Sequence, residues 1–294
     1  MRFMGIGRLE VRFGPAKEFV PIEEPTMLRQ SVRLLPVLIL GFANAAMAQG
    51  TFAHIAYGAG YTTTFTFVNS SPSNQTSLNL YFYGDNGSTL TPPIQGVTNP
   101  QSPYSFTIPA GGATTIVLPD LGNLAATVTG WASLQSLDGI PVKGQGSFKR
   151  VYPGSPDYEM SVPLIGAATE CIIPFPDLSA TILIPFDNTT GVHLTAFAIA
   201  NTTSSSQTVS IEFDDQSGTR ILADTWMIPA NNHTSFLSTD TTTPAPASLP
   251  HGYAATAGRM GTLKISASIQ DIGVLALLVN QTSGTLTSVL PISQ

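Results

Sequence analysis

Apolar and polar residues alternate with a period of two along several short segments of the chain. In residues 77–83 every second residue is apolar, and residues 208–214 repeat the pattern. Such alternation is typical of β-strands that bury one face. We therefore expect two strands whose inward side chains are Leu78, Leu80, Phe82, Val209, Ile211 and Phe213.

Turn-forming residues follow both segments. Residues 84–87 (Gly-Asp-Asn-Gly) and 214–218 (Asp-Asp-Gln-Ser-Gly) are rich in Gly, Asn and Asp, so we expect a hairpin turn at each. No segment after residue 48 has convincing helical periodicity. Short strands that recur about every ten residues with turns between them are typical of a sandwich or barrel.

The downstream part of the chain contains an internal repeat. Five blocks recur in the same order, which indicates two copies of one structural unit. The matched blocks are 64–70 with 196–202, 78–82 with 209–213, 108–115 with 228–235, 132–135 with 267–270, and 160–164 with 287–291.

The repeat places two units at residues 49–165 and 180–294, joined by a Pro-rich linker at residues 166–179. We expect an all-β protein with two tandem immunoglobulin-like antiparallel β-sandwich domains, in which paired sheets bury their inner faces. The strand spacing leaves immunoglobulin, fibronectin and jelly-roll topologies open.

Residues 27–48 have the three parts of a secretory signal peptide. Two arginines precede an apolar run at residues 34–45, and Ala46-Met47-Ala48 supplies the small residues of a cleavage site. The run is shorter than the roughly 20 apolar residues that span a bilayer. We expect residues 1–48 to be an N-terminal extension plus signal peptide, the mature chain to lack a membrane span, and the product to be secreted or extracytoplasmic. Met1 or Met27 could be the true start.

Charge and cysteine content restrict the function further. Residues 49–294 contain six basic and fourteen acidic side chains, a net charge of −8. Such a chain lacks the cationic surface that nucleic-acid binding requires. The single cysteine, Cys171, excludes an intramolecular disulfide, and its apolar neighbours favour a structural role.

No motif predicts a catalytic site, a metal site or a cofactor. The four histidines are dispersed, so a zinc site or a Ser-His-Asp triad would have to be assembled by folding. The histidines are His54, His193, His233 and His251. The adjacent Asp214 and Asp215 favour a turn over paired catalytic carboxylates, with calcium binding left open.

Four aromatic residues are candidate ligand contacts. Tyr81 and Tyr83 lie on the expected outward face of the segment at 77–83, and exposed rings of this kind bind sugars or protein partners. Trp131 and Trp226 are the other two candidates, although core packing is the favoured role for both.

Three segments carry a resemblance to known proteins. Residues 58–69 (GAGYTTTFTFVN), 108–112 (IPAGG) and 183–189 (LIPFDNT) resemble a group of uncharacterised secreted proteins of soil bacteria. The likeness extends over nearly the whole mature chain. It implies an exported pair of β-sandwiches, and it implies no activity because a fold does not determine a function.

We therefore expect a non-catalytic secreted module, structural or adhesive, without a cofactor. Its partner would be a cell-surface or extracellular protein or polysaccharide, reached through sheet faces or edge strands. The alternative is a carbohydrate-binding module that uses its exposed aromatic residues.

Overall fold

The computed structural model describes residues 49–122, 126–151, 158–164, 181–241, 249–267, 272–289 and 292–293. All of them belong to one compact unit, Asn44–Gln294. The expected signal peptide, the linker and Cys171 lie outside the described residues.

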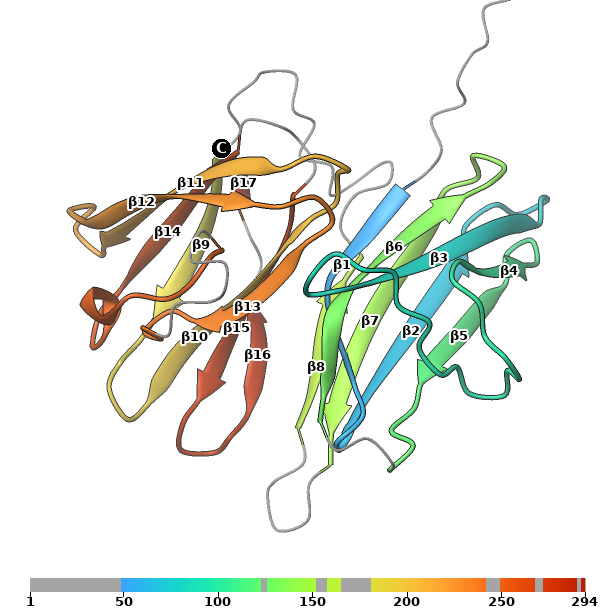
Figure 1. The fold of residues 1–294 in the computed structure, drawn as a ribbon, viewed down its shortest axis with the longest axis horizontal. Coiled ribbons are helices and arrows are strands. Elements are labelled where there is room, and N and C mark those ends of the chain that lie inside the picture. Colours follow the sequence, from blue (N-terminus) through green and yellow to red (C-terminus); the bar gives the residue numbers. More distant parts are fainter. Residues whose placement is uncertain are drawn as a thin grey trace, which may run out of the picture. The chain divides into compact units, whose positions relative to one another are not determined.

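The strands form four antiparallel sheets, which confirms the all-β prediction (Figure 1). Sheet 1 contains, in order, β1 (Gln49–Tyr57), β6 (Val128–Ser136), β3 (Thr76–Gly84) and β4 (Tyr104–Ile108). Sheet 2 contains β5 (Ala113–Leu118), β2 (Tyr61–Asn69), β7 (Val142–Arg150) and β8 (Tyr158–Pro163). Sheet 3 contains β12 (Arg220–Ile228), β11 (Gln207–Asp215), β14 (Met260–Ala267), β9 (Thr181–Asp187) and β17 (Ile292–Ser293). Sheet 4 contains β13 (His233–Leu237), β10 (His193–Asn201), β15 (Ile272–Asn280) and β16 (Leu286–Val289). One short 3₁₀ turn, η1 (Ala254–Thr256), is the helical element of the described residues.

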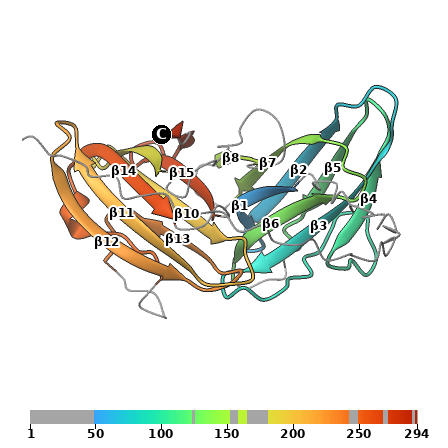
Figure 2. The ribbon, with the colours of Figure 1, turned by 90° about the horizontal axis from the view of Figure 1, so that it is seen from above.

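Sheets 1 and 2 enclose one hydrophobic core, and sheets 3 and 4 enclose another (Figure 2). We call them the first and second sheet pairs. The six side chains expected to face inward are all buried, because the alternation of each strand directs them between two sheets. The largest buried rings of the two cores are Phe52, Phe65, Phe67 and Phe82, and Phe197, Phe213 and Trp226.

The two sheet pairs have the same strand order. Sheet 1 runs β1-β6-β3-β4, and sheet 3 runs β9-β14-β11-β12 with β17 added beside β9. Sheets 2 and 4 correspond in the same way, as β5-β2-β7-β8 and β13-β10-β15-β16. Each strand of the first pair therefore has an equivalent in the second, and residues can be compared position by position.

One predicted match is wrong. The sequence matched residues 132–135 with residues 267–270. In the structure Ala132 pairs with Phe82 of β3, and Leu263 pairs with Phe213, the equivalent residue of β11. Ala132 therefore corresponds to Leu263 and not to Ala267. The error is a shift by an even number of residues, which leaves the inward and outward alternation unchanged and is therefore invisible in the pattern.

Two glycines support the corrected register. A Cβ atom at Gly130 would lie 2.0 Å from the carbonyl oxygen of Tyr83, and one at Gly261 would lie 1.9 Å from that of Asp214. Both positions therefore need the close backbone approach that glycine alone permits.

The turn expected at residues 84–87 is confirmed, and Gly87 closes it with a φ of 77°. The turn expected at residues 214–218 is shorter than predicted. Asp214 and Asp215 are the last residues of β11, since their backbones pair with β14. The turn spans residues 215–218, in which the backbone N–H of Gly218 donates to the carbonyl of Asp215 at 2.9 Å, and Gly218 has a φ of 78°.

Two buried asparagines occupy equivalent places in the sheet pairs. In each of Asn69 and Asn201, the side-chain Nδ2 donates hydrogen bonds to three backbone carbonyls, and Oδ1 accepts a hydrogen bond from a backbone N–H. The carbonyls belong to Asn74, Ile108 and Pro109, and to Ser205, Ile228 and Pro229. Each asparagine thereby ties the end of its strand to two loops.

Candidate functional site

The four candidate aromatic residues are all partly or fully buried. Tyr81 and Tyr83 are half-buried, whereas Trp131 and Trp226 have exposed fractions of 1% and 2%. Among the described residues, the exposed large apolar side chains include no aromatic ring. Tyr81 and Tyr83 keep part of their surface exposed, so their contact with a sugar stays a prediction.

Trp226 belongs to the second core, as the sequence favoured. Its Nε1 donates to the hydroxyl oxygen of Tyr253 at 3.0 Å, and the two rings lie nearly parallel. The Tyr253 hydroxyl in turn donates to the carboxylate of Asp224. Burial, and then the neighbouring Asp224, raise the pKa of Tyr253, so it remains a neutral donor.

Trp131 has a different role, because it lies on the outer face of sheet 1. Its ring stacks on Tyr83 with centroids 4.3 Å apart, and its Nε1 donates to the carbonyl of Asn231 at 2.8 Å. Asn231 belongs to the loop that precedes β13. A loop of the second sheet pair therefore covers the aromatic face of the first.

His233 fastens the same loop to the first sheet pair. Its side chain is fully buried, with Nδ1 2.7 Å from Asp85 Oδ1 and Nε2 3.2 Å from His54 Nδ1. The other oxygen of Asp85 accepts the hydroxyl of Thr129 at 2.6 Å. We call these residues, together with Trp131, the junction; they are His54, Asp85, Thr129, Trp131, Asn231 and His233.

The junction changes the acidity of two of its groups. Burial, followed by the neighbouring His233, lowers the pKa of His54 to about 3, with Asp85 acting in the opposite direction. For Asp85, burial would raise the pKa, but the hydrogen bond and charge of His233 outweigh it and lower the pKa below its usual value. At neutral pH, His54 is therefore uncharged and Asp85 is ionised.

Folding thus brings together two of the four histidines that are dispersed in the sequence. His193 lies elsewhere, with Nδ1 2.7 Å from Asp187 Oδ2, and His251 packs against Tyr253. Within the described ranges, no group of three His, Cys, Asp or Glu side chains is arranged to hold a metal ion. Both ring nitrogens of the buried His233 are occupied by protein partners, so this ring cannot reach a substrate.

A β-bulge explains why sequence patterns miss the junction. The pairing of β1 with β6 shifts between Phe52 and Ile55, opposite Trp131. A bulge inserts a residue and redirects side chains, and here it places His54 against His233. Bulges carry no clear signal in a single sequence, so the partner of His54 could not be predicted.

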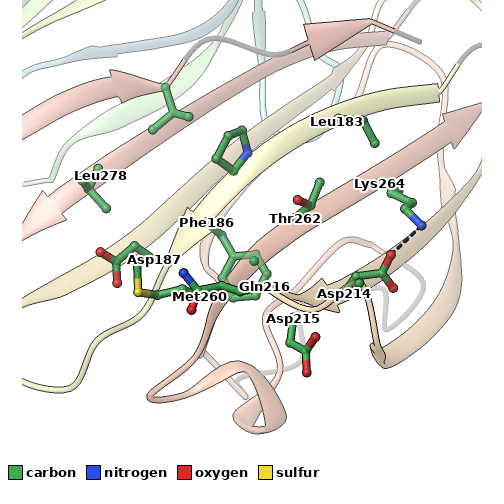
Figure 3. Close-up of a pocket in the computed structure, with 14 residues that line it drawn as sticks. Leu183, Phe186, Asp187, Asp214, Asp215, Gln216, Met260, Thr262, Lys264 and Leu278 are labelled. Atoms are coloured by element: carbon green, nitrogen blue, oxygen red, sulfur yellow. Dashed lines mark ion pairs between the residues drawn. The ribbon is translucent and has the colours of Figure 1, made fainter.

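A groove of about 700 Å³ lies on sheet 3 (Figure 3). Its floor is formed by the outward residues of β9 and β14, and its sides by the end of β11 and by sheet 4. Its lining residues are Leu183, Pro185, Phe186, Asp187, Asp214, Asp215, Gln216, Gly218, Met260, Gly261, Thr262, Lys264, Leu278 and Val289.

Ion pairs line one side of the groove. Lys264 Nζ lies 2.5 Å from Asp214 Oδ2 and 2.8 Å from Glu212 Oε1, and Arg220 pairs with the other oxygen of Glu212. The bond from Lys264 lowers the pKa of Glu212, and the bonds to Asp214 and Glu212 raise the pKa of Lys264. Glu212 and Lys264 therefore stay charged at neutral pH.

One oxygen in the groove has no partner. Asp214 has an exposed fraction of 4%, and its Oδ1 makes no hydrogen bond to any described residue. A buried carboxylate oxygen without a donor is costly, and native proteins rarely leave one unsatisfied. This oxygen has almost no accessible surface, so it lies within the wall of the groove and not at its open surface.

The groove is the equivalent of the surface that forms the junction. Tyr83 pairs with Trp131 in sheet 1, and Asp214 pairs with Thr262 at the same place in sheet 3. The turn at residues 84–87 likewise corresponds to residues 215–218. The second sheet pair therefore repeats this surface, and no loop among the described residues covers it.

A scan against models of known protein families finds no match, and a search of curated proteins finds no relative. Among the described residues there is no helix with the length and apolar character needed to cross a bilayer.

Proposed function

We propose that the protein is a non-catalytic, exported structural or adhesive module built from two tandem immunoglobulin-like β-sandwiches. The signal-peptide pattern of residues 27–48 supports export. The shared strand order of the two sheet pairs supports a duplicated domain. The module acts by contact with another surface.

One observation carries the proposal: the histidine cluster that folding assembles is used to hold the two sheet pairs together. His233 is fully buried between Asp85 and His54. Grouped titratable residues with shifted pKa values often mark active sites. Here both ring nitrogens of the buried His233 are taken by protein partners, and the cluster stabilises a contact between two parts of the same chain.

A two-part screen with the purified full-length protein tests this function. The protein is exposed to immobilised polysaccharides and to cell-envelope fractions, and separately to panels of ester, peptide and glycoside substrates. We expect saturable, protease-sensitive retention on an envelope fraction, and no product from any substrate. Product release that disappears in both His54→Asn and Asp85→Asn would overturn the proposal.

A further inference from the structure

We propose that the groove of sheet 3 binds a second copy of this chain, which docks there with the outer face of its sheet 2. Copies would then associate head to tail. The inference rests on the proposed function, because self-association is one way in which a structural module acts.

The first step is that the equivalent surface of the first sheet pair, around β1, already contacts another part of the same chain. The outer face of sheet 4 packs on the first sheet pair, and its residues Ala198, Leu275 and Leu277 belong to the first hydrophobic core. The strand that receives them is β1, which lies next to β10 and β15. The groove surrounds β9, the equivalent of β1, so it is the second copy of a docking surface.

The second step is that the chain also has a second copy of the docking face. Ala198 pairs with Leu275 in sheet 4, and the equivalent pair in sheet 2 is Thr66 with Gln145. This face of sheet 2 forms a shallow hollow of its own, and its residues are Thr64, Thr66, Val68, Lys143, Gly144, Gln145, Gly146 and Ser147. Each copy therefore presents one docking face and one groove.

The third step concerns the closest point of approach. Within the chain, a Cβ atom at Gly273 would lie 3.0 Å from the methyl group of Thr51, so a larger residue would require Thr51 to move. The equivalent of Gly273 is Lys143, and the equivalent of Thr51 is Leu183. Between equivalent positions, β1 has two residues, Ala53 and His54, where β9 has only Pro185. The surface of β9 is therefore hollow at this point, and the groove has room for the side chain of Lys143.

The fourth step is the match of charge. Three carboxylates line the groove, those of Asp187, Asp214 and Asp215, beside one ammonium group, that of Lys264. A lysine that enters the groove therefore meets more carboxylates than ammonium groups, and it can donate to a carboxylate oxygen in a charge-assisted hydrogen bond. Complementary charge of this kind fixes register and favours the correct partner. Lys143 of the second copy thus brings a positive charge to a groove whose charged groups are mainly carboxylates.

Apolar contacts accompany these polar ones. Val68 on the docking face has an exposed fraction of 43%, and at the groove Met260 has 39% and Ile292, beside Leu183, has 56%. Because the two faces differ, the interface is heterologous and generates rings or open chains of copies.

Sedimentation velocity of the full-length protein over a range of concentrations tests the inference. We expect the wild type to form oligomers that grow with concentration and dissociate at high salt. Two single variants each disable one face: Lys143→Glu reverses the charge of the docking face, and Thr262→Arg fills the groove with a cation. Each variant alone is expected to be monomeric.

The decisive measurement is sedimentation velocity of a mixture of the two variants. Lys143→Glu keeps an intact groove and Thr262→Arg keeps an intact docking face, so the mixture is expected to form one-to-one dimers and nothing larger. Thr208→Arg, on an exposed part of β11 outside the groove, is the control and is expected to associate like the wild type. Circular dichroism establishes that each variant is folded.

A wild type that stays monomeric up to about 100 µM, or a mixture that forms no dimer, would overturn the inference. If Thr262→Arg does not fold, the salt dependence of the wild type and the Lys143→Glu variant still decide the question. A monomer that nevertheless binds envelope fractions would end the head-to-tail inference and leave the proposed function intact.

Discussion

His233 Nδ1 lies 2.7 Å from Asp85 Oδ1, although 148 residues separate them in the chain. The backbone N–H of His233 also donates to the carbonyl of Asp85 at 3.1 Å. In the first sheet pair the position of His233 is taken by Ala113, which cannot make either side-chain contact. The two sheet pairs therefore differ at a residue that holds them together.

Acid is expected to open the junction. His54 is neutral in the closed junction, where its pKa is about 3, and an exposed histidine has a pKa of 6.5. Opening therefore takes up a proton below pH 6.5. The stability of the closed junction is complete above pH 6.5, and the closed-to-open ratio falls by up to about tenfold per pH unit as the pH drops from 6.5 towards 3.

The fluorescence of Trp131 measures this opening, because its ring is buried only while the junction is closed. In a Trp226→Phe variant the emission is expected to shift to the red between pH 6.5 and 4. The companion variant Trp131→Phe reports on the second core through Trp226 and should not shift. His54→Asn keeps a hydrogen-bond donor without a titrating group, so an unchanged pH profile in this variant would refute the explanation.

Alanine substitution at the two equivalent glycines is expected to be strongly destabilising. Gly130→Ala and Gly261→Ala each place a Cβ within 2.0 Å of a carbonyl oxygen, which forces the strands apart. Each should lower the free energy of unfolding by about 3 kcal/mol or more, measured by urea denaturation. Gly139→Ala, which meets no atom within 4 Å, is the control and should cost about 1 kcal/mol for its positive φ.

The buried asparagines are expected to be equally important in both sheet pairs. Asn69→Ala and Asn201→Ala each leave backbone groups without a partner, so each should cost about 2–4 kcal/mol of unfolding free energy. The exposed Asn74→Ala should change stability by less than about 0.5 kcal/mol. Equal thermal midpoints for Asn69→Ala, Asn201→Ala and the wild type would mean that these hydrogen bonds contribute nothing.

The strands and their inward residues could be predicted because alternation is a local property of the sequence. Leu80 and Ile211 are buried for the same reason, and each can be assigned from its neighbours. The register of β14 could not be assigned, because a shift by an even number of residues preserves the alternation that places Leu263 inward.

The junction and the groove could not be predicted, because both depend on contacts between distant residues. Trp131 is outward on its strand and buried only by the loop at Asn231, so no pattern within sheet 1 indicates its burial. The groove depends on a bulge that β1 has and β9 lacks. Such a difference appears only when the two sheet pairs are compared strand by strand.

The central claim is that the cluster at Asp85 and His233 fastens the two sheet pairs together. A double-mutant cycle with Asp85→Ala and His233→Ala, read out as the free energy of unfolding in urea, measures it most directly. We predict a coupling energy of about 1–3 kcal/mol, because each single variant already loses the shared contact. Strictly additive losses at neutral pH would contradict the claim.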